Sequence, residues 1–236
     1  MFASISFLLT AIVLGLPAAL IFIPLAVITR WITPLYIVGH SIARISVWMA
    51  GVRVQEEGRE KIPAGQACIF MSNHLSNLDP PILMPRVPRR NSVFLKKSLM
   101  KIPFLGAAMK LGEYVPVSRD GSVEGAKTSI TAAAQVLAKG IHMTTFVEGT
   151  RSRDGRMLPF KKGPFYLAQE SGAPIIPVSI YGTETMMAKN SLRIKPGTAH
   201  LIFHDPILAT DYATREELML AVRKAIASGL PEWMRA

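Results

Sequence analysis

A histidine and an aspartate five positions apart are the residues of this chain best suited to chemistry. They are His74 and Asp79 in the run 73–81, NHLSNLDPP. A neutral imidazole held by a carboxylate can take a proton from an alcohol near pH 7. On a helix the two side chains would face apart, because five residues turn it by roughly 140°. Pro80 disfavours the α region for Asp79, so we expect a bent loop in which Asp79 folds back to orient the ring of His74.

The position of this pair in the chain favours a functional interpretation. The apolar run 67–71 stands immediately upstream and is typical of a buried strand. Ligands of α/β sheets bind beyond the carboxyl ends of strands. The alternative is a surface histidine with Asp79 capping the next turn. A metal site at His74 and Asp79 is a further alternative, but it lacks a third ligand nearby.

A second polar loop follows the strand-like run 141–146, with the sequence FVEGTRSR over residues 146–153. Gly149 would let the backbone approach a ligand closely, and Thr150 offers a hydroxyl. Arg151 matches the geometry of a phosphate with two parallel hydrogen bonds. An ordinary polar turn is the alternative for this segment alone.

Cations also follow two other strand-like runs. Lys96 comes after the run 92–95, and Arg119 comes after the run 114–117. Polar loops at four strand ends indicate one shared crevice.

The elements that would position these loops alternate between strand-like and helix-like patterns from residue 52 onward. The strand-like runs are 52–55, 67–71, 92–95, 114–117, 141–146, 175–181 and 200–203. A helical stripe covers 123–137, and Thr214 with Glu217 forms a capping box before a helix ending near Gly229. The alternation predicts an α/β fold with a mostly parallel or mixed central sheet flanked by helices. The prolines of the run 173–178 indicate a stiff segment at the edge of the sheet, lining an apolar site.

The first fifty residues differ in character from the rest. Nearly every residue from 5 to 28 is apolar, and as a helix this stretch would measure roughly 36 Å, more than a hydrocarbon core. Pro17 and Pro24 interrupt it, so a bent or re-entrant helix competes with a straight span. A cleaved signal peptide fits less well, because no basic segment precedes the apolar run. We expect membrane-anchoring helices over 1–50 and a catalytic α/β domain over 51–236. The apolar stripe 35–49 suits core packing and an interfacial helix equally.

Composition narrows the partners and the compartment. Of 236 residues, 50% are hydrophobic and 18% are charged, with a net charge of +11. The positive net charge indicates anionic partners. Phosphates and an anionic membrane surface fit better than nucleic acid, because aromatic residues do not interleave with the basic ones. Basic residues follow the apolar segment, which places the rest of a spanning chain on the cytoplasmic side. The one cysteine, Cys68, lies in an apolar run and suits buried packing in a cytoplasmic chain.

Four ordered blocks in residues 52–181 carry a resemblance to a known family. They are Asn73-His74-x4-Asp79, Arg119 after a strand, the run 146–152, and the run 173–177. The chain resembles the glycerolipid acyltransferases and, more narrowly, the 1-acyl-glycerol-3-phosphate (lysophosphatidate) acyltransferases. Val147 stands where this family usually has proline, and Ser118 stands where an acidic residue is common.

The resemblance implies transfer of an acyl chain from acyl-CoA or acyl carrier protein to the sn-2 hydroxyl of lysophosphatidic acid, giving phosphatidic acid. Under it, His74 is the general base, Asp79 fixes its tautomer, and no metal, cofactor or acyl-enzyme is needed. The remaining motif residues would hold the acceptor phosphate or shape its pocket: Lys96, Arg119, Glu148, Gly149, Thr150 and Arg151. The reaction would take place at the bilayer, on the cytoplasmic face of the cell membrane.

Other functions stay open on the sequence alone. The same chemistry suits another lysolipid acceptor, such as a lysophospholipid with a headgroup, an ornithine lipid or a lipid A precursor. Hydrolysis would use Ser76 beside His74, although no G-x-S-x-G motif surrounds Ser76. A non-catalytic membrane anchor would account for the apolar N-terminus and the net charge, but not for the His74/Asp79 pair.

Overall fold

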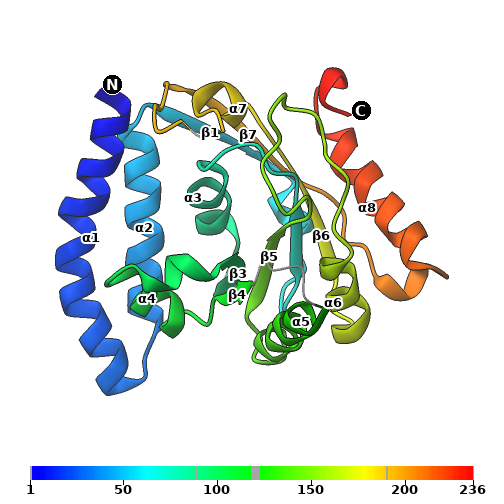
Figure 1. Cartoon of the computed structure of the whole chain (residues 1–236), viewed down its shortest axis with the longest axis horizontal. Coiled ribbons are helices and arrows are strands. Elements are labelled where there is room, and N and C mark those ends of the chain that lie inside the picture. Colours follow the sequence, from blue (N-terminus) through cyan, green and yellow to red (C-terminus); the bar gives the residue numbers. More distant parts are fainter. Residues whose placement is uncertain (1, 89, 118–122, 190, 236) are drawn as a thin grey trace.

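A mixed seven-stranded sheet forms the centre of the computed structural model, which describes residues 2–88, 90–117, 123–189 and 191–235 (Figure 1). The strands are β1 Val52–Glu57, β2 Ile69–Ser72, β3 Asn91–Lys96, β4 Val115–Val117, β5 His142–Phe146, β6 Ile175–Tyr181 and β7 Gly197–Phe203. Their order is β1-β7-β6-β2-β5-β3-β4, and every pair is parallel except β6 with β7. Each predicted strand is present, and the predicted fold class is confirmed.

Helices cover both faces of this sheet. They are α1 Phe2–Thr29, α2 Thr33–Met49, α3 Asp79–Leu83, α4 Leu105–Leu111, α5 Val123–Ala138, α6 Gly163–Ser171, α7 Thr183–Met186 and α8 Arg215–Ser228. Side chains alternate along β2, so Ile69 and Met71 join α5, α6 and α8 in one core cluster. Phe70 joins α2, α3 and α7 in the other. The central strands are therefore buried on both faces, as their continuous apolar runs indicate.

The two helices predicted from periodicity and capping are confirmed. α5 spans the stripe over 123–137, and its Ala133, Val136 and Leu137 are buried. At the start of α8 the Thr214 hydroxyl accepts the Glu217 N–H at 3.2 Å, and the Glu217 carboxylate accepts the Thr214 N–H at 3.1 Å. This capping box fixes where the last long helix begins.

The prediction that the proline-containing run 173–178 lies at the edge of the sheet is wrong. β6 lies between β7 and β2, and it is buried over six of its seven residues. Pro177 is tolerated there because the β6–β7 ladder begins only at Val178. The Pro177 carbonyl still accepts the His204 N–H at 3.0 Å. The missing N–H of Pro177 therefore falls just outside the β6–β7 ladder.

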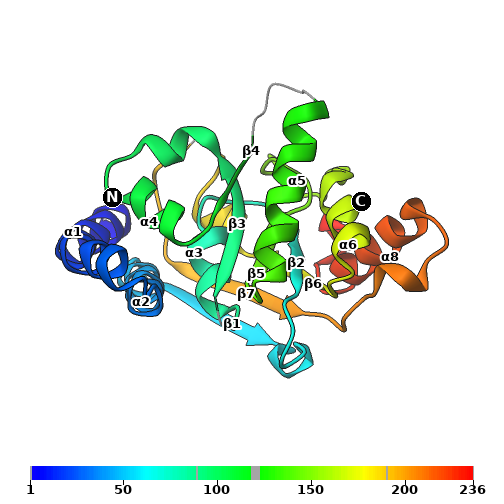
Figure 2. The same cartoon turned by 90° about the horizontal axis from the view of Figure 1, so that it is seen from below.

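α1 and α2 form an antiparallel hairpin along one side of the molecule (Figures 1 and 2). α1 is continuous from Phe2 to Thr29, with Pro17 and Pro24 inside it. Among the described residues it is the one helix whose length and composition would allow it to cross a membrane. α2 packs against α1 and α3 and buries Ser46 and Val47. Ile45 and Met49 of the apolar stripe are exposed, as is Trp48.

Candidate active site

The His74 side chain lies against the Asp79 carboxylate just beyond the carboxyl end of β2. His74 Nδ1 is 2.8 Å from Asp79 Oδ2, and that oxygen also accepts the N–H groups of Leu75 and Ser76 at 2.7 and 2.8 Å. A carboxylate oxygen only accepts, so Nδ1 is the donor and the neutral ring presents Nε2 as its basic nitrogen. Asp79 is fully buried and the His74 side chain is 16% exposed. The pair thus has a fixed tautomer and an accessible basic face.

The loop between β2 and α3 is held by contacts to β6 and to the residue that follows α7. The Asn73 amide donates to the Ile180 carbonyl at 2.8 Å and accepts the Ile180 N–H at 2.9 Å, which extends β2 along β6. The Ser76 hydroxyl donates to the Met187 carbonyl at 2.8 Å. The bent loop is thus present as predicted, and it spans residues 73–78.

One detail of the prediction for this loop is wrong, because Asp79 does not lie outside the helix. α3 begins at Asp79, and Leu78 before it already has helical dihedral angles. Pro80 and Pro81 lack an N–H where the first turn of a helix needs none, so they start the helix instead of preventing it. Asp79 folds back from this first turn to reach the loop.

Two residues that sequence reasoning missed complete the surroundings of the pair. The Thr183 hydroxyl donates to Asp79 Oδ1 at 2.6 Å and is fully buried. Thr183 follows Gly182, whose φ of +91° turns the chain sharply at the end of β6. The Phe146 ring stacks on the His74 ring with 4.1 Å between centroids. No local sequence pattern predicts the Thr183–Asp79 or the Phe146–His74 contact, although Thr183 and Phe146 both stand near strand ends.

The loop after β5 reaches the same edge of the sheet, as its position in the parallel order predicts. The Ser152 N–H donates to the His74 carbonyl at 2.8 Å, which ties the two loops together. Gly149 has a φ of +68° and lies under the Lys161 side chain, which a Cβ atom would meet at 3.1 Å. Glycine therefore suits this position on both counts.

Arg151 carries a buried guanidinium nitrogen, Nη1, for which no hydrogen-bond partner exists among the described residues. The neighbouring backbone is nevertheless fixed, because Lys189 Nζ donates to the Arg151 carbonyl at 2.7 Å and lies 3.3 Å from the Thr150 hydroxyl. A buried unpaired donor on a positive group is unfavourable without a ligand. An anion is the ligand that this arrangement suits best.

Glu148 is a buried carboxyl in the same loop, with 1% of its surface exposed. Burial raises the pKa of Glu148 to about 8, and the negative charge of Asp79 adds to the rise. Backbone N–H groups of His74 and Leu158 and the positive charge of Arg223 act in the opposite direction. Glu148 therefore remains largely protonated at neutral pH, next to a carboxylate that accepts four hydrogen bonds.

The remaining predicted residues lie farther from this centre or outside the described chain. Lys96 ends β3 at the same edge of the sheet and is exposed, and no hydrogen bond joins it to either loop in the described ranges. Arg119 lies outside the described residues. Where the structure is described, no three His, Cys, Asp or Glu side chains come together as a metal site.

The hydrolytic alternative loses its nucleophile in this structure. Ser76 is fully buried, and its hydroxyl donates to a backbone carbonyl of residue 187. A serine held in this way cannot reach a substrate carbonyl.

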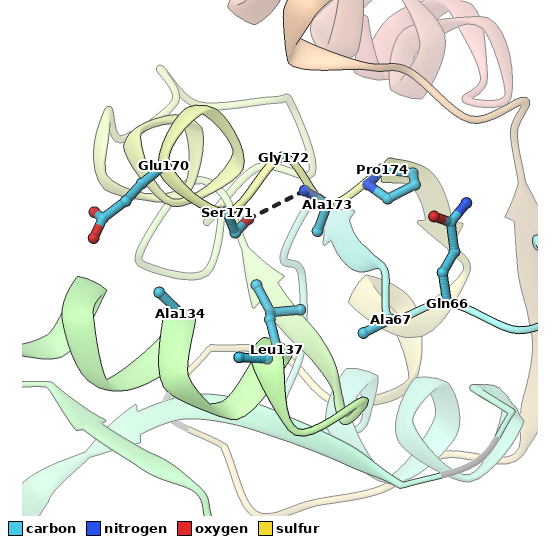
Figure 3. Close-up of a pocket in the computed structure, with 10 residues that line it drawn as sticks. Gln66, Ala67, Ala134, Leu137, Glu170, Ser171, Gly172, Ala173 and Pro174 are labelled. Atoms are coloured by element: carbon cyan, nitrogen blue, oxygen red, sulfur yellow. Dashed lines mark hydrogen bonds between the residues drawn. The ribbon is translucent and has the colours of Figure 1, made fainter.

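A separate depression of about 430 Å³ lies at the opposite end of the sheet, at the amino ends of β2 and β6 (Figure 3). Ala134 and Leu137 of α5, Ser171 of α6 and Pro174 line part of it, and its charged lining residue is Glu170. A depression lined by a carboxylate and no cation does not suit a phosphate. The loops after β2 and β5 therefore stay the candidate site.

Comparison with known proteins identifies the family. Residues 53–181, more than half of the chain, match the family model described as Acyltransferase. The chain belongs to the acyltransferase family. The family predicted from the four blocks is thereby confirmed, and the matched range contains His74, Asp79 and the loop after β5.

Several curated relatives share one name. The chain is 31% identical over 174 residues to 1-acyl-sn-glycerol-3-phosphate acyltransferase of Limnanthes douglasii, a match covering 74% of this chain and 61% of the plant protein. It is 29% identical over 198 residues to the protein of that name from Borreliella burgdorferi, covering 83% and 78%.

A solved structure agrees over nearly the whole chain. The crystal structure of the 1-acyl-sn-glycerophosphate (LPA) acyltransferase PlsC from Thermotoga maritima superposes with a TM-score of 0.83 at 25% identity. The superposition covers 96% of this chain and 92% of the other. The N-terminal hairpin and the α/β part therefore share one arrangement with that protein.

Proposed function

We propose that this acyltransferase moves an acyl chain from acyl-CoA or acyl carrier protein to the sn-2 hydroxyl of 1-acylglycerol-3-phosphate, giving phosphatidic acid. The observation that supports the proposal is that a base and an anion-binding donor lie on two loops tied by the Ser152–His74 backbone hydrogen bond. His74 has an available basic nitrogen, and Arg151 has an unpaired buried donor. The names of the relatives agree with an acceptor that carries both a hydroxyl and a phosphate.

In the proposed reaction, His74 Nε2 takes the proton of the acceptor hydroxyl while the oxygen attacks the thioester carbonyl. The new C–O bond forms and the C–S bond breaks, and the thiolate that leaves takes up the proton from the imidazolium. Asp79 stabilises that imidazolium across the 2.8 Å contact. General-base catalysis of this kind supplies about 10²–10⁴ in rate, or roughly 3–5 kcal/mol. Positioning of the two lipids supplies the rest.

The acceptor phosphate would be bound by Arg151, with Thr150 and the backbone at Gly149 lining the same loop. Protonated Glu148 suits this role, because a neutral carboxyl does not repel a phosphate as a carboxylate would. Lys96 and Arg119 stay predicted as additional cations of this site.

The N-terminal hairpin would hold the enzyme at the membrane without crossing it. The Ser4 hydroxyl accepts the Ile194 N–H at 2.7 Å, and the Ser6 hydroxyl donates to the Met49 carbonyl at 2.9 Å. Both contacts hold the start of α1 next to the α/β part, where α2 also ends. A single spanning helix would place its two ends on opposite sides of the bilayer. We therefore favour a hairpin lying in the cytoplasmic leaflet.

The test is an assay of purified protein in mixed micelles with acyl-CoA or acyl carrier protein and a panel of lysolipid acceptors, with products identified by mass spectrometry. Phosphatidic acid from 1-acylglycerol-3-phosphate is the expected product, and a preference for another lysolipid would replace the acceptor. His74→Ala should lower turnover at least about 100-fold while the melting temperature persists. Asn77→Ala changes an exposed residue of the same loop and is the matched control. Unchanged turnover in His74→Ala would remove the base assignment.

A further inference from the structure

The segment that leaves β3 presents large apolar side chains to solvent. It runs through a 3-10 helix, η3 (Lys97–Lys101), and a turn into α4. Leu99, Ile102, Phe104 and Leu105 are 37%, 44%, 45% and 44% exposed. Four such residues within seven positions form a cluster, unlike the single exposed apolar residues that are normal on protein surfaces.

The fold holds these side chains outward. Met100 and Met109 turn inward and pack on a small core cluster with Leu95. The Gly106 N–H donates to the Ile102 carbonyl at 2.7 Å, and a Cβ atom at Gly106 would lie 2.2 Å from the Met100 carbonyl oxygen. The turn is therefore tight and specific, with Met100 and Met109 packed on the small cluster and its other apolar residues exposed.

The backbone of Phe104 also indicates that the fold specifies this exposure. Its φ is +59° and its ψ is −52°, a combination that residues other than glycine rarely adopt. A strained backbone that exposes a phenylalanine ring to water is unfavourable. Burial of that ring against a partner surface would offset this cost.

The charge around the cluster has one sign. Lysines stand at positions 96, 97, 101 and 110, and no acidic residue occurs between Asn91 and Gly112. Lysines beside exposed apolar side chains suit an anionic lipid surface, because headgroups attract the ammonium groups while acyl chains receive the apolar tips.

The cluster adjoins the apolar hairpin. α4 packs against α1, and Figure 2 shows α4 beside α1, above α2 in this view. Exposed apolar residues run along the length of α1, among them Phe2, Leu9, Ile12, Leu20 and Ile28. The segment after β3 therefore extends an apolar surface that begins on the hairpin.

We propose that residues 97–105 form a second membrane contact, which inserts Leu99, Ile102, Phe104 and Leu105 into the interfacial layer of an anionic bilayer. This inference rests on the proposed membrane location of the enzyme and adds a contact made by the α/β part itself. Because β3 and β5 are neighbours in the sheet, this contact brings the edge that carries the catalytic loops next to the lipid surface.

The test places a fluorescent label at Ile102→Cys in the full-length protein, bound to vesicles of phosphatidylethanolamine and phosphatidylglycerol that contain nitroxide-labelled acyl chains. The native Cys68 is fully buried, so the introduced thiol is the reactive one. Ile12→Cys on α1 is the membrane control. Leu220→Cys, an apolar residue of α8 that is 59% exposed, is the solvent control. A labelled variant with a lowered melting temperature is replaced by Leu99→Cys.

We expect nitroxide quenching at position 102 comparable to that at position 12, at a depth of about 5–10 Å, and little quenching at position 220. Quenching at position 12 alone would overturn this inference and leave the membrane location intact. Absence of quenching at both positions would refute the membrane location itself. A blue-shifted label at 102 without quenching would mean that a protein surface, such as a second copy, covers the segment, and this also overturns the inference.

The lysines are tested separately with Lys97→Gln/Lys101→Gln in the Ile102→Cys background. The same vesicles are used, and the readout is the ratio of quenching at position 102 to that at position 12. The ratio should fall, since each lysine near an anionic surface contributes about fivefold to partitioning. An unchanged ratio would overturn the role assigned to the lysines.

Discussion

Replacing Glu148 with glutamine should remove a loss of stability that the native chain suffers as pH rises. The pKa of Glu148 is raised from its ordinary value of 4.5 to about 8, chiefly by burial. Between these two values the unfolded chain has released the proton and the folded chain retains it. The free energy of unfolding therefore falls as pH rises through this window, and the full stabilisation is present only below it.

The size of the effect follows from the two pKa values. A difference of about 3.5 between the folded and unfolded states corresponds to roughly 5 kcal/mol, at about 1.4 kcal/mol for each tenfold change in proton affinity. Glutamine resembles the neutral acid in shape and does not titrate. Its amide needs a partner in the buried site, which would cost about 1–3 kcal/mol at every pH. The free energy of unfolding should thus change less with pH in the variant than in the native chain, whatever the constant difference between the two.

The assay is the melting temperature from the fluorescence of the three tryptophans, measured in detergent between about pH 5 and pH 9. The native chain should lose melting temperature steadily up to about pH 8, and Glu148→Gln should show a flatter profile. Glu170→Gln, at an exposed carboxylate of α6, is the control and should parallel the native chain. Parallel profiles for Glu148→Gln and the native chain would refute the reasoning, because they would show that the carboxyl gains no proton affinity on folding.

Two further substitutions test the positioning of the site and the stability of the fold. Thr183→Val removes a hydrogen bond to the buried Asp79 carboxylate and should lower kcat about tenfold or more. Thr183→Ser keeps the hydroxyl and should restore kcat. Equal kcat in the valine and serine variants would contradict a positioning role for the hydroxyl. Gly58→Ala introduces a Cβ atom 2.1 Å from the Phe203 carbonyl oxygen at a φ of +75°, so it should destabilise the fold by more than about 1 kcal/mol with KM unchanged. Its melting temperature and kinetics decide this, and a melting temperature equal to that of the native chain would show that the turn after β1 relaxes freely.

The strands were predictable because their signal is local. Continuous apolar runs bounded by turn residues mark buried strands, and each of the seven runs became a strand. Proline was the source of both errors in the backbone. Pro177 suggested an edge strand because it lacks an N–H, and Pro80 suggested a non-helical Asp79 because proline disfavours the α region for the residue before it. In this fold both fall where no regular partner is needed.

The site was predictable only in part, because many of its contacts join segments that are distant in the sequence. The His74–Asp79 contact spans five positions and could be inferred from the loop that must hold it. The Thr183–Asp79 contact spans 104 positions and depends on β6 lying next to β2. The sequence alone does not give that strand order, so the threonine carried no recognisable signal.

Some polar groups of the site have hydrogen-bond partners within the protein, and others are left for a ligand. His74 is fixed on its Nδ1 side by Asp79, on its carbonyl by Ser152, and on its ring face by Phe146. Its Nε2 has no partner in the described part of the chain, and the same holds for Arg151 Nη1. His74 Nε2 therefore stays in place without a protein partner. The free energy of desolvation of the buried Arg151 Nη1 is recovered only when a ligand supplies an acceptor. Such an arrangement favours the transition state of a reaction that needs both a base and an anion-binding donor, since both are already in place before the substrate binds.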